Sequence, residues 1–247
     1  MKLFIDFGNT IIKTAVWKNN KLFLIKSIEN NQTGIRKNFI SNYKKHNINK
    51  VIFTSVINRQ TLKIYMSIIK QIFNCPFHEF KSTKKLLGVK NAYTQPNKLG
   101  SDRWAAIVGS YLKFKKALCL VDCGTAISID YVTNSGNHLG GYILSGIDGY
   151  TSSFSSAHNL KNIRLKNIHS AQGINFPKST EKAIFDGYTL MVISAIEKSY
   201  NNFCSTESRK PLLIVSGGYG QIVSKRLSIK NQYDPNIVLN SLAHIAR

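Results

Sequence analysis

The stretch IDFGNTIIK, at Ile5–Lys13, joins the end of an apolar strand to a turn that contains an acid, a glycine and two small polar residues. A second stretch, VDCGTAISID at Val121–Asp130, repeats this construction in the second half of the chain. One Asp-x-Gly turn alone favours an ordinary tight hairpin, since Asp and Gly are common turn residues. Two such turns in corresponding places indicate one α/β unit built twice.

The hydrophobic pattern around the first turn predicts three strands in an antiparallel meander, then a helix, a buried strand and a second helix. These six elements are expected at 2–6, 14–17, 22–28, 33–46, 51–56 and 60–73. After the second turn the pattern restarts, with strands expected in ALCLVD, ISIDYV, GGYIL and LLIVSG. We therefore predict two α/β domains, 1–116 and 117–247, that share an interface with a cleft between them.

Charge is the most unusual bulk property, because 34 Lys and Arg against 12 Asp and Glu give a formal +22. Such a field attracts polyanions. The lysines are nevertheless spread in ones and twos, and Lys, Asn and Ile are enriched together as AT-rich codons would enrich them. Compositional drift is therefore favoured over a nucleic-acid surface, which stays the second interpretation.

The four cysteines, Cys75, Cys119, Cys123 and Cys204, have neither zinc-ligand spacing nor the pattern of a disulfide framework. We therefore expect reduced, buried thiols in a cytoplasmic protein. Asp6 interrupts the apolar N-terminus before a signal-peptide core forms, and no run approaches the ~20 apolar residues that span a bilayer. No membrane association is expected.

The two turns have the chemistry of phosphate binding. Gly8 and Gly124 can adopt positive φ and carry no Cβ, which lets backbone N–H groups approach an anion closely. Asn9, Thr10 and Thr125 add donors for phosphate oxygens, and an aspartate at the strand end suits a hydrated cation. For Lys13 a phosphate contact and a solvent-facing position are equally open.

Two familiar nucleotide motifs are absent, since the chain contains neither a P-loop nor Gly-x-Gly-x-x-Gly. A third glycine-rich turn, VSGGYG at 215–220, again follows an apolar strand. Its paired glycines would let the backbone lie against a base or ribose, and a plain strand-to-helix turn explains them equally well.

These residues together resemble the actin, sugar-kinase and Hsp70 ATPase superfamily, with its duplicated ribonuclease-H-like domains and a nucleotide cleft between them. More narrowly, the chain resembles type III pantothenate kinases over roughly residues 1–245. The matching segments are DFGNTIIK, LGSDRWAA, DCGTAISID, GGYILSG and YDPNIVLNSL. The resemblance implies ATP-dependent phosphorylation of pantothenate to 4'-phosphopantothenate, the first step of coenzyme A biosynthesis.

A helix is predicted to begin near Ser101, a plausible N-cap, because apolar residues then recur at i, i+3, i+4, i+7 and i+8. Asp102 and Arg103 would occupy its first turn, where the helix dipole keeps a carboxylate ionised. The resemblance implies that Asp102 accepts the proton of the pantothenate hydroxyl. It also implies that Tyr93, Gly100, Ser101, Asp102, Arg103 and Thr180 bind this substrate.

The resemblance assigns the remaining roles as well. ATP is expected to bind Thr125 and the segment Asp6, Phe7, Gly8, Asn9, Thr10, Ile11, Ile12 and Lys13. Asp6 would hold Mg²⁺ through water, and Asp122 a monovalent cation, K⁺ or ammonium. Either Ser179 or Thr180 is expected to cap the following helix, whose apolar residues on more than one face fit a homodimer. A transcriptional accessory role and a kinase for another hydroxylated metabolite are the alternatives.

Overall fold

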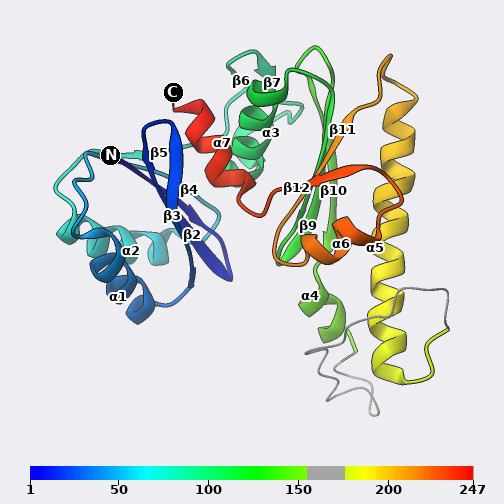
Figure 1. The fold of residues 1–247 in the computed structure, drawn as a ribbon, viewed down its shortest axis with the longest axis horizontal. Helices are drawn as coiled ribbons and strands as arrows, with labels where there is room; N and C mark the ends of the chain where they lie inside the picture. The colour runs from blue at the N-terminus through cyan, green and yellow to red at the C-terminus, as the bar shows by residue number, and fades with distance from the viewer. Residues whose placement is uncertain (155–175, 247) are drawn as a thin grey trace. The chain divides into compact units, whose positions relative to one another are not determined.

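The computed structural model describes residues 1–154 and 176–246, and the chain divides into two compact units (Figure 1). Unit 1 consists of Met1–Lys116, Val132–Gly140 and Asn236–Arg247. Unit 2 consists of Ala117–Tyr131 and Gly141–Pro235. The domain ranges 1–116 and 117–247 stay a prediction, and the units are described separately below.

Unit 1 is built on a five-stranded mixed sheet with the order β3-β2-β1-β4-β5. Strand β1 pairs antiparallel with β2 and parallel with β4. It therefore joins the antiparallel β1–β2–β3 part of the sheet to the parallel part that contains β4. The strands are β1 (Lys2–Phe7), β2 (Ile11–Lys18), β3 (Lys21–Glu29), β4 (Lys50–Ser55) and β5 (Phe77–Glu79).

Helices α1 (Gln32–Tyr43) and α2 (Arg59–Ile72) bury their apolar stripes in one core with this sheet. Helix α3 (Ser101–Phe114) packs against α7 (Ile237–Ile245), and a Cβ on Gly109 would lie 2.3 Å from the Ser241 Cα. This close crossing fixes the helix that carries the predicted base. The remaining elements are β6 (Lys85–Leu86), β7 (Val89–Lys90) and a 3-10 turn, η1 (Pro96–Lys98).

Unit 2 repeats the strand order, β10-β9-β8-β11-β12, with β11 parallel to both β8 and β12. Its core lies between this sheet and the buried side of a 25-residue helix, α5. The elements are β8 (Leu118–Cys123), β9 (Ala126–Val132), β10 (His138–Ser145), α4 (Ile147–Ser152), α5 (Thr180–Cys204), β11 (Leu212–Ser216), α6 (Gly220–Arg226) and β12 (Asn231–Tyr233).

The repeated sheet order confirms the prediction of a duplicated α/β unit and of a β-β-β-α-β-α order in the first copy. The short outer strands β5 and β12 were not predicted, because three residues carry too little periodicity to identify a strand. Helix α1 ends at Tyr43, three residues earlier than expected.

All four cysteines are free thiols, as predicted, although Cys75 and Cys204 are only half-buried. Burial raises the pKa of Cys119 and Cys123 well above that of an exposed thiol, so both stay protonated and unreactive at neutral pH. Among the helices that the structure describes, none is long and apolar enough to cross a membrane.

Candidate active site

The first predicted phosphate-binding turn links β1 to β2, and Asn30 ties it to the rest of unit 1. The Asn30 side-chain amide donates to the carbonyl oxygens of Gly8 (3.2 Å) and Asn9 (2.8 Å), and its backbone N–H donates to that of Thr10 (3.2 Å). Its Oδ1 accepts from the buried hydroxyl of Tyr65 at 2.6 Å. Three successive carbonyls of the turn are thus held by one residue.

Gly8 is required at this turn for a different reason from the one predicted. Neither Gly8 nor Gly124 adopts the positive φ that is open to a glycine. Instead, a Cβ on Gly8 would lie 2.6 Å from the backbone oxygen of Ile11. The turn closes so tightly on itself that a side chain would have to displace backbone.

The side chains of the first segment divide into two groups. Phe7 and Ile12 have no exposed surface, belong to the core of unit 1 and are paired in its sheet, so neither residue offers accessible surface to a ligand. Asn9, Thr10 and Ile11 are exposed, while Asp6 and Lys13 are half-buried. The polar groups suited to phosphate therefore lie on the accessible side of the turn.

The predicted base lies in the first turn of α3. Asp102 is half-buried, and its Oδ1 accepts the backbone N–H of Arg103 at 2.7 Å. A Cβ on Gly100 would lie only 2.6 Å from this oxygen, so the glycine leaves room for the carboxylate. The positive end of the α3 dipole favours the ionised form, as a proton acceptor requires.

Ser101 does not cap α3, which corrects the prediction. Gly100 occupies the N-cap position and makes no side-chain capping bond. The Ser101 hydroxyl is engaged with the end of β4 instead, where it pairs with the Thr54 hydroxyl and with the backbone N–H and carbonyl of Ser55, both at 3.2 Å. Tertiary contacts outcompete the local capping bond here.

Arg103 and Tyr93, two predicted substrate residues, are in contact. The Arg103 guanidinium donates to the Tyr93 hydroxyl at 3.2 Å and lies 5.9 Å from the ring centroid. The buried His138 ring stacks on Tyr93, with centroids 6.3 Å apart and planes 18° apart. His138 Nδ1 also accepts the N–H of Ala92 at 3.4 Å. The structure thus gathers Tyr93, Gly100, Ser101, Asp102 and Arg103 in unit 1.

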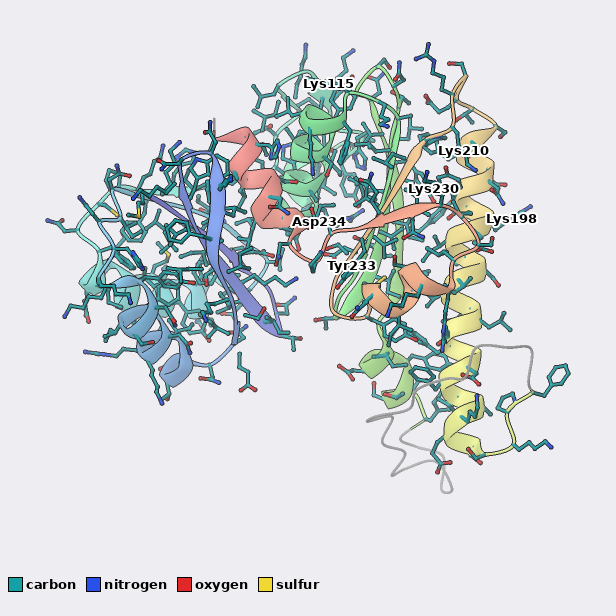
Figure 2. All side chains as sticks on the ribbon, in the orientation of Figure 1. Lys115, Lys198, Lys210, Lys230, Tyr233 and Asp234 are labelled. Atoms are coloured by element: carbon teal, nitrogen blue, oxygen red, sulfur yellow. The ribbon has the colours of Figure 1, made fainter. Side chains whose placement is uncertain are left out.

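In unit 2 the corresponding turn joins β8 to β9, with half-buried Asp122 at the strand end and exposed Gly124 and Thr125 in the turn. Two other glycines hold it in place. A Cβ on Gly146 would lie 2.3 Å from the Thr125 oxygen, and one on Gly217 would lie 2.3 Å from the Cys123 oxygen. The Tyr233 hydroxyl, labelled in Figure 2, donates to the Gly217 carbonyl at 3.3 Å.

The glycine-rich turn VSGGYG behaves differently at its two adjacent glycines. Gly217 has φ +89° and no room for a Cβ, whereas Gly218 has no heavy atom within 4 Å of the Cβ position. The turn also brings the N–H of Tyr219 to the Cys123 carbonyl at 3.1 Å. Gly217 therefore has a structural role against β8, and the backbone at Gly218 stays open to a ligand.

Thr180 is exposed at the first position of α5. The capping bond belongs to its neighbour, since the Ser179 hydroxyl accepts the N–H of Lys182 at 3.3 Å. Of the two residues predicted as possible caps, Ser179 is the one used. The Thr180 hydroxyl is therefore not committed to capping the helix.

Among residues 1–154 and 176–246, no three His, Cys, Asp or Glu side chains are close enough together to form a metal cage. Asp6 and Asp122 each offer one half-buried carboxylate beside a turn rich in backbone donors. One carboxylate with water and phosphate oxygens is a donor set that suits Mg²⁺.

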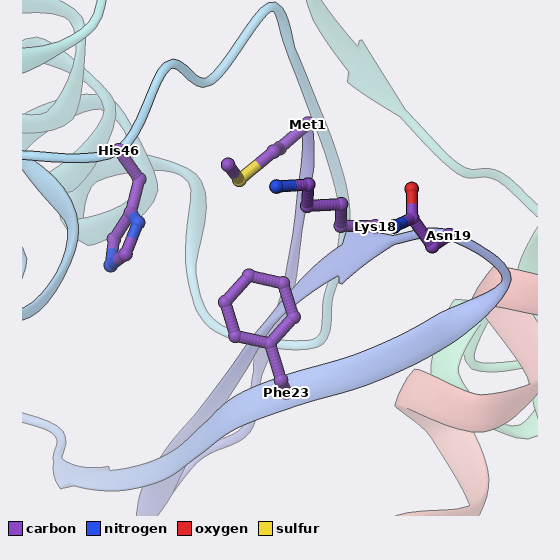
Figure 3. Close-up of a pocket in the computed structure, with 5 residues that line it drawn as sticks. All are labelled: Met1, Lys18, Asn19, Phe23 and His46. Carbon is purple, nitrogen blue, oxygen red and sulfur yellow. The ribbon is translucent and has the colours of Figure 1, made fainter.

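A surface pocket of about 380 Å³ also lies in unit 1, lined by Met1, Lys18, Asn19, Phe23 and His46 (Figure 3). Met1 precedes β1 and Lys18 ends β2, so the pocket lies at the opposite end of these strands from the Gly8–Thr10 turn. A strand of this length spans roughly 20 Å. The pocket is therefore separate from the predicted phosphate-binding residues.

Comparison with known proteins shows the family. The family model of type III pantothenate kinase matches residues 2–202. This chain belongs to that family. A type III pantothenate kinase from Pseudoalteromonas translucida is 31% identical, with 98% of this chain and 94% of the relative covered. One from Nitrosomonas eutropha is 26% identical over 99% and 94% of the two chains. The predicted resemblance is confirmed, and the protein is a kinase.

Solved structures confirm the fold. A Campylobacter jejuni protein described as a Baf family transcriptional activator superposes with a TM-score of 0.61 at 23% identity, covering 98% of this chain and 96% of that one. A ROK family glucokinase from Streptomyces griseus superposes with a TM-score of 0.52 at 12% identity, covering 99% and 97%. Identities this low speak for the fold alone, which is that of the actin-like ATPases.

Three residues around the candidate site were missed from the sequence: Asn30, Thr54 and His138. Thr54 had left a signal, because it is a polar residue inside the apolar run VIFTSV. Asn30 directly precedes Asn31, the N-cap of α1. Polar residues are common at a helix start, so the sequence did not single out Asn30. His138 has no ligand spacing to any other histidine, and only the fold places it behind Tyr93.

Proposed function

We propose that this protein transfers the γ-phosphoryl group of ATP to the primary hydroxyl of pantothenate, giving ADP and 4'-phosphopantothenate in the first step of coenzyme A biosynthesis. The observation that carries the proposal is the first turn of α3. There a half-buried carboxylate, Asp102, directly precedes Arg103, whose guanidinium is held against Tyr93. A proton acceptor thus shares one helical turn with a side chain suited to binding an anionic substrate.

Asp102 acts as the base. The bond between the γ-phosphorus and the bridging oxygen of ATP breaks while the substrate oxygen bonds to phosphorus, and the hydroxyl proton passes to the Asp102 carboxylate. Phosphoryl transfer has a loose transition state, so a base has mainly to orient the hydroxyl. The contact between Asp102 Oδ1 and the Arg103 N–H fixes the carboxylate for that task.

Arg103, Tyr93 and the backbone around Gly100 and Ser101 bind pantothenate, and Thr180 contributes its hydroxyl. Pantothenate is a carboxylate, and a guanidinium is well suited to bind one through parallel hydrogen bonds. Stacking of His138 on Tyr93 holds that ring in place as a wall of the site.

Each unit supplies one phosphate-binding turn for ATP. In unit 1 the turn offers the accessible residues within Asp6–Lys13, including the Asn9 and Thr10 side chains, and in unit 2 it offers Gly124 and Thr125. When bound, Mg²⁺ neutralises phosphate charge. The single carboxylate of Asp6 would hold it through water, and Asp122 would hold a monovalent cation, K⁺ or ammonium.

A homodimer completes the proposal. Helix α5 leaves Leu190 and Met191 exposed at 68% and 43%, and strand β10 leaves Tyr142 and Ile143 exposed at 57% and 63%. Large apolar side chains gathered on two elements are typical of a protein interface. We infer that two copies associate through these elements and that Thr180 of one copy serves the substrate site of the other.

One experiment tests the base and the shared site together. We expect Asp102→Asn to lower turnover by roughly 10²- to 10⁴-fold, the usual contribution of a general base, while ATP binding, measured by calorimetry, stays close to wild type, because Asp102 lies outside both phosphate-binding turns. We expect Thr180→Val to be inactive for lack of its hydroxyl. Mixing the two variants under subunit exchange should restore part of the activity, since some mixed dimers then contain one intact site.

Each part of this result can fail separately. A wild-type kcat in Asp102→Asn would show that Asp102 is not the base. Mixed variants that stay as inactive as each alone, or a monomer in light scattering, would overturn the shared site. Activity on other hydroxylated metabolites and not on pantothenate would show a kinase with another substrate.

A further inference from the structure

Thr54 lies at the end of strand β4, between two parts of the candidate site. It is the last buried residue of the strand, with no exposed surface, and its neighbour in the parallel pairing is Asp6 of β1. Adjacent strands run about 4.8 Å apart. Thr54 therefore stands beside the aspartate that opens the first phosphate-binding turn.

On its other side Thr54 reaches the first turn of α3. Its hydroxyl pairs with the hydroxyl of Ser101, the residue directly before the proposed base Asp102. The Val56 side chain, two residues further along, lies 3.7 Å from the Cβ position of Gly100. The segment at the end of β4 thus lies against two successive residues at the start of α3, Gly100 and Ser101.

The hydrogen-bond pattern at Ser101 leaves no capacity for a substrate. A serine hydroxyl has one donor and two acceptor positions. The Ser101 hydroxyl donates to the Ser55 carbonyl and accepts the Ser55 N–H, both at 3.2 Å, and the Thr54 hydroxyl is its third hydrogen-bond partner. The side chain of Ser101 is saturated by β4.

We propose that the Thr54–Ser101 hydroxyl pair is a positioning device that sets the Asp102 carboxylate relative to the phosphate-binding turn that follows Asp6. The inference rests on the proposed role of Asp102 as the base. The side chain of Ser101 then acts through Asp102 and not on pantothenate directly. Thr54 touches neither substrate, and it fixes the spacing between the groups that do.

The chain offers a matched control for this proposal. Thr14, on β2, is also fully buried, and its hydroxyl pairs with that of Tyr43 at 2.6 Å. Tyr43 in turn donates to the Leu24 carbonyl at 2.9 Å. Replacing either threonine by valine removes one buried hydroxyl pair from the same sheet at the same side-chain volume. Only Thr54 connects to the first turn of α3.

The experiment compares Thr54→Val, Thr54→Ser and Thr14→Val in the full-length enzyme, with thermal unfolding measured for each. We expect Thr54→Val to lower kcat by roughly 10- to 100-fold with little change in KM for ATP, since small misplacements of reacting groups have effects of this size. Thr54→Ser keeps the hydroxyl and should recover most of the rate. Thr14→Val should unfold at a lower temperature with kcat within about twofold of wild type.

A double-variant comparison separates positioning from stability. If Thr54 acts through Asp102, then adding Thr54→Val to Asp102→Asn should lower the residual rate no further. A further loss in the double variant, or equal losses of kcat in Thr54→Val and Thr14→Val, would overturn the proposal. If Asp102→Asn were fully active, the proposed base would be wrong, and any loss in Thr54→Val would need another cause.

Discussion

The two units share one strand order but support their phosphate-binding turns in opposite ways. In unit 1 the turn depends on polar side chains, since Asn30 binds three of its carbonyls and Tyr65 binds Asn30. In unit 2 the neighbours are glycines, Gly146 and Gly217, whose missing side chains let backbone pack on the turn. The turn is thus held in place by side-chain hydrogen bonds in unit 1 and by close backbone packing in unit 2.

The difference extends to the glycine inside each turn. Gly8 has no room for a methyl group, because the Ile11 oxygen lies 2.6 Å from its Cβ position. Gly124 has room, since the nearest atom to its Cβ position is the Ala126 oxygen at 3.6 Å, an ordinary contact. If Gly124 is essential, a bound ligand must be the cause.

The largest effect is therefore expected from the pair Gly8→Ala and Gly124→Ala. Gly8→Ala must shift backbone, which we expect to destabilise the protein by about 1–3 kcal/mol and to remove most activity with ATP. Gly124→Ala should unfold at the wild-type temperature. Differential scanning fluorimetry with and without ATP, together with steady-state rates, measures both effects.

The same pair shows whether ATP approaches the second turn closely. Loss of ATP stabilisation in a normally folded Gly124→Ala would place phosphate against that backbone, as proposed. Wild-type kinetics would mean that ATP leaves room for a methyl group there. Equal melting temperatures for the two variants would contradict the asymmetry between the turns.

The sequence predicted the parts of this comparison that depend on neighbouring residues. The turns, their flanking strands and the first turn of α3 follow from periodicity and from Asp-x-Gly, which are local properties. The supports could not be found in this way, because Asn30 lies two strands beyond the turn it binds. Ser101 shows the limit most clearly. Its position in the sequence predicted a helix N-cap, whereas in the structure its hydroxyl bonds to the end of β4.

A smaller effect should distinguish Asp6 and Asp122, the next-to-last residues of β1 and β8. Both are half-buried, and each pairs in register with a hydroxyl residue of the adjacent parallel strand, Asp6 with Thr54 and Asp122 with Ser216. If Asp122 holds a monovalent cation, the rate should rise when K⁺ or ammonium replaces Na⁺. Asp122→Ala should lose this response and keep a basal rate.

The control for this prediction is Asp122→Asn, which retains an oxygen ligand without the charge. It should give a weaker response at higher K⁺ concentration, because a neutral amide oxygen attracts the cation less strongly than a carboxylate. Equal rates of the wild-type enzyme in Na⁺ and K⁺ would show that no such site supports activity.

Charge is the last contrast, and its expected effect is the smallest. Unit 1 carries 23 Lys and Arg against 4 Asp and Glu, a formal +19, whereas unit 2 carries 11 against 8, a formal +3. Two of the acids in unit 1 are the site residues Asp6 and Asp102, and a third, Glu79, already pairs with Arg59 and Lys81. Lys198, Lys210 and Lys230, labelled in Figure 2, belong to the more balanced unit 2.

If this excess is compositional drift, it should attract nucleic acid only as a diffuse field. We expect weak binding to duplex DNA, with a dissociation constant of roughly 10⁻⁴–10⁻⁶ M near physiological salt, a steep fall with added salt and no sequence preference. Fluorescence anisotropy on two unrelated duplexes across a salt series measures all three properties. Asp102→Asn should bind as the wild type does. Tight binding with a clear preference for one duplex would favour the transcriptional role instead, because charge alone reads no sequence.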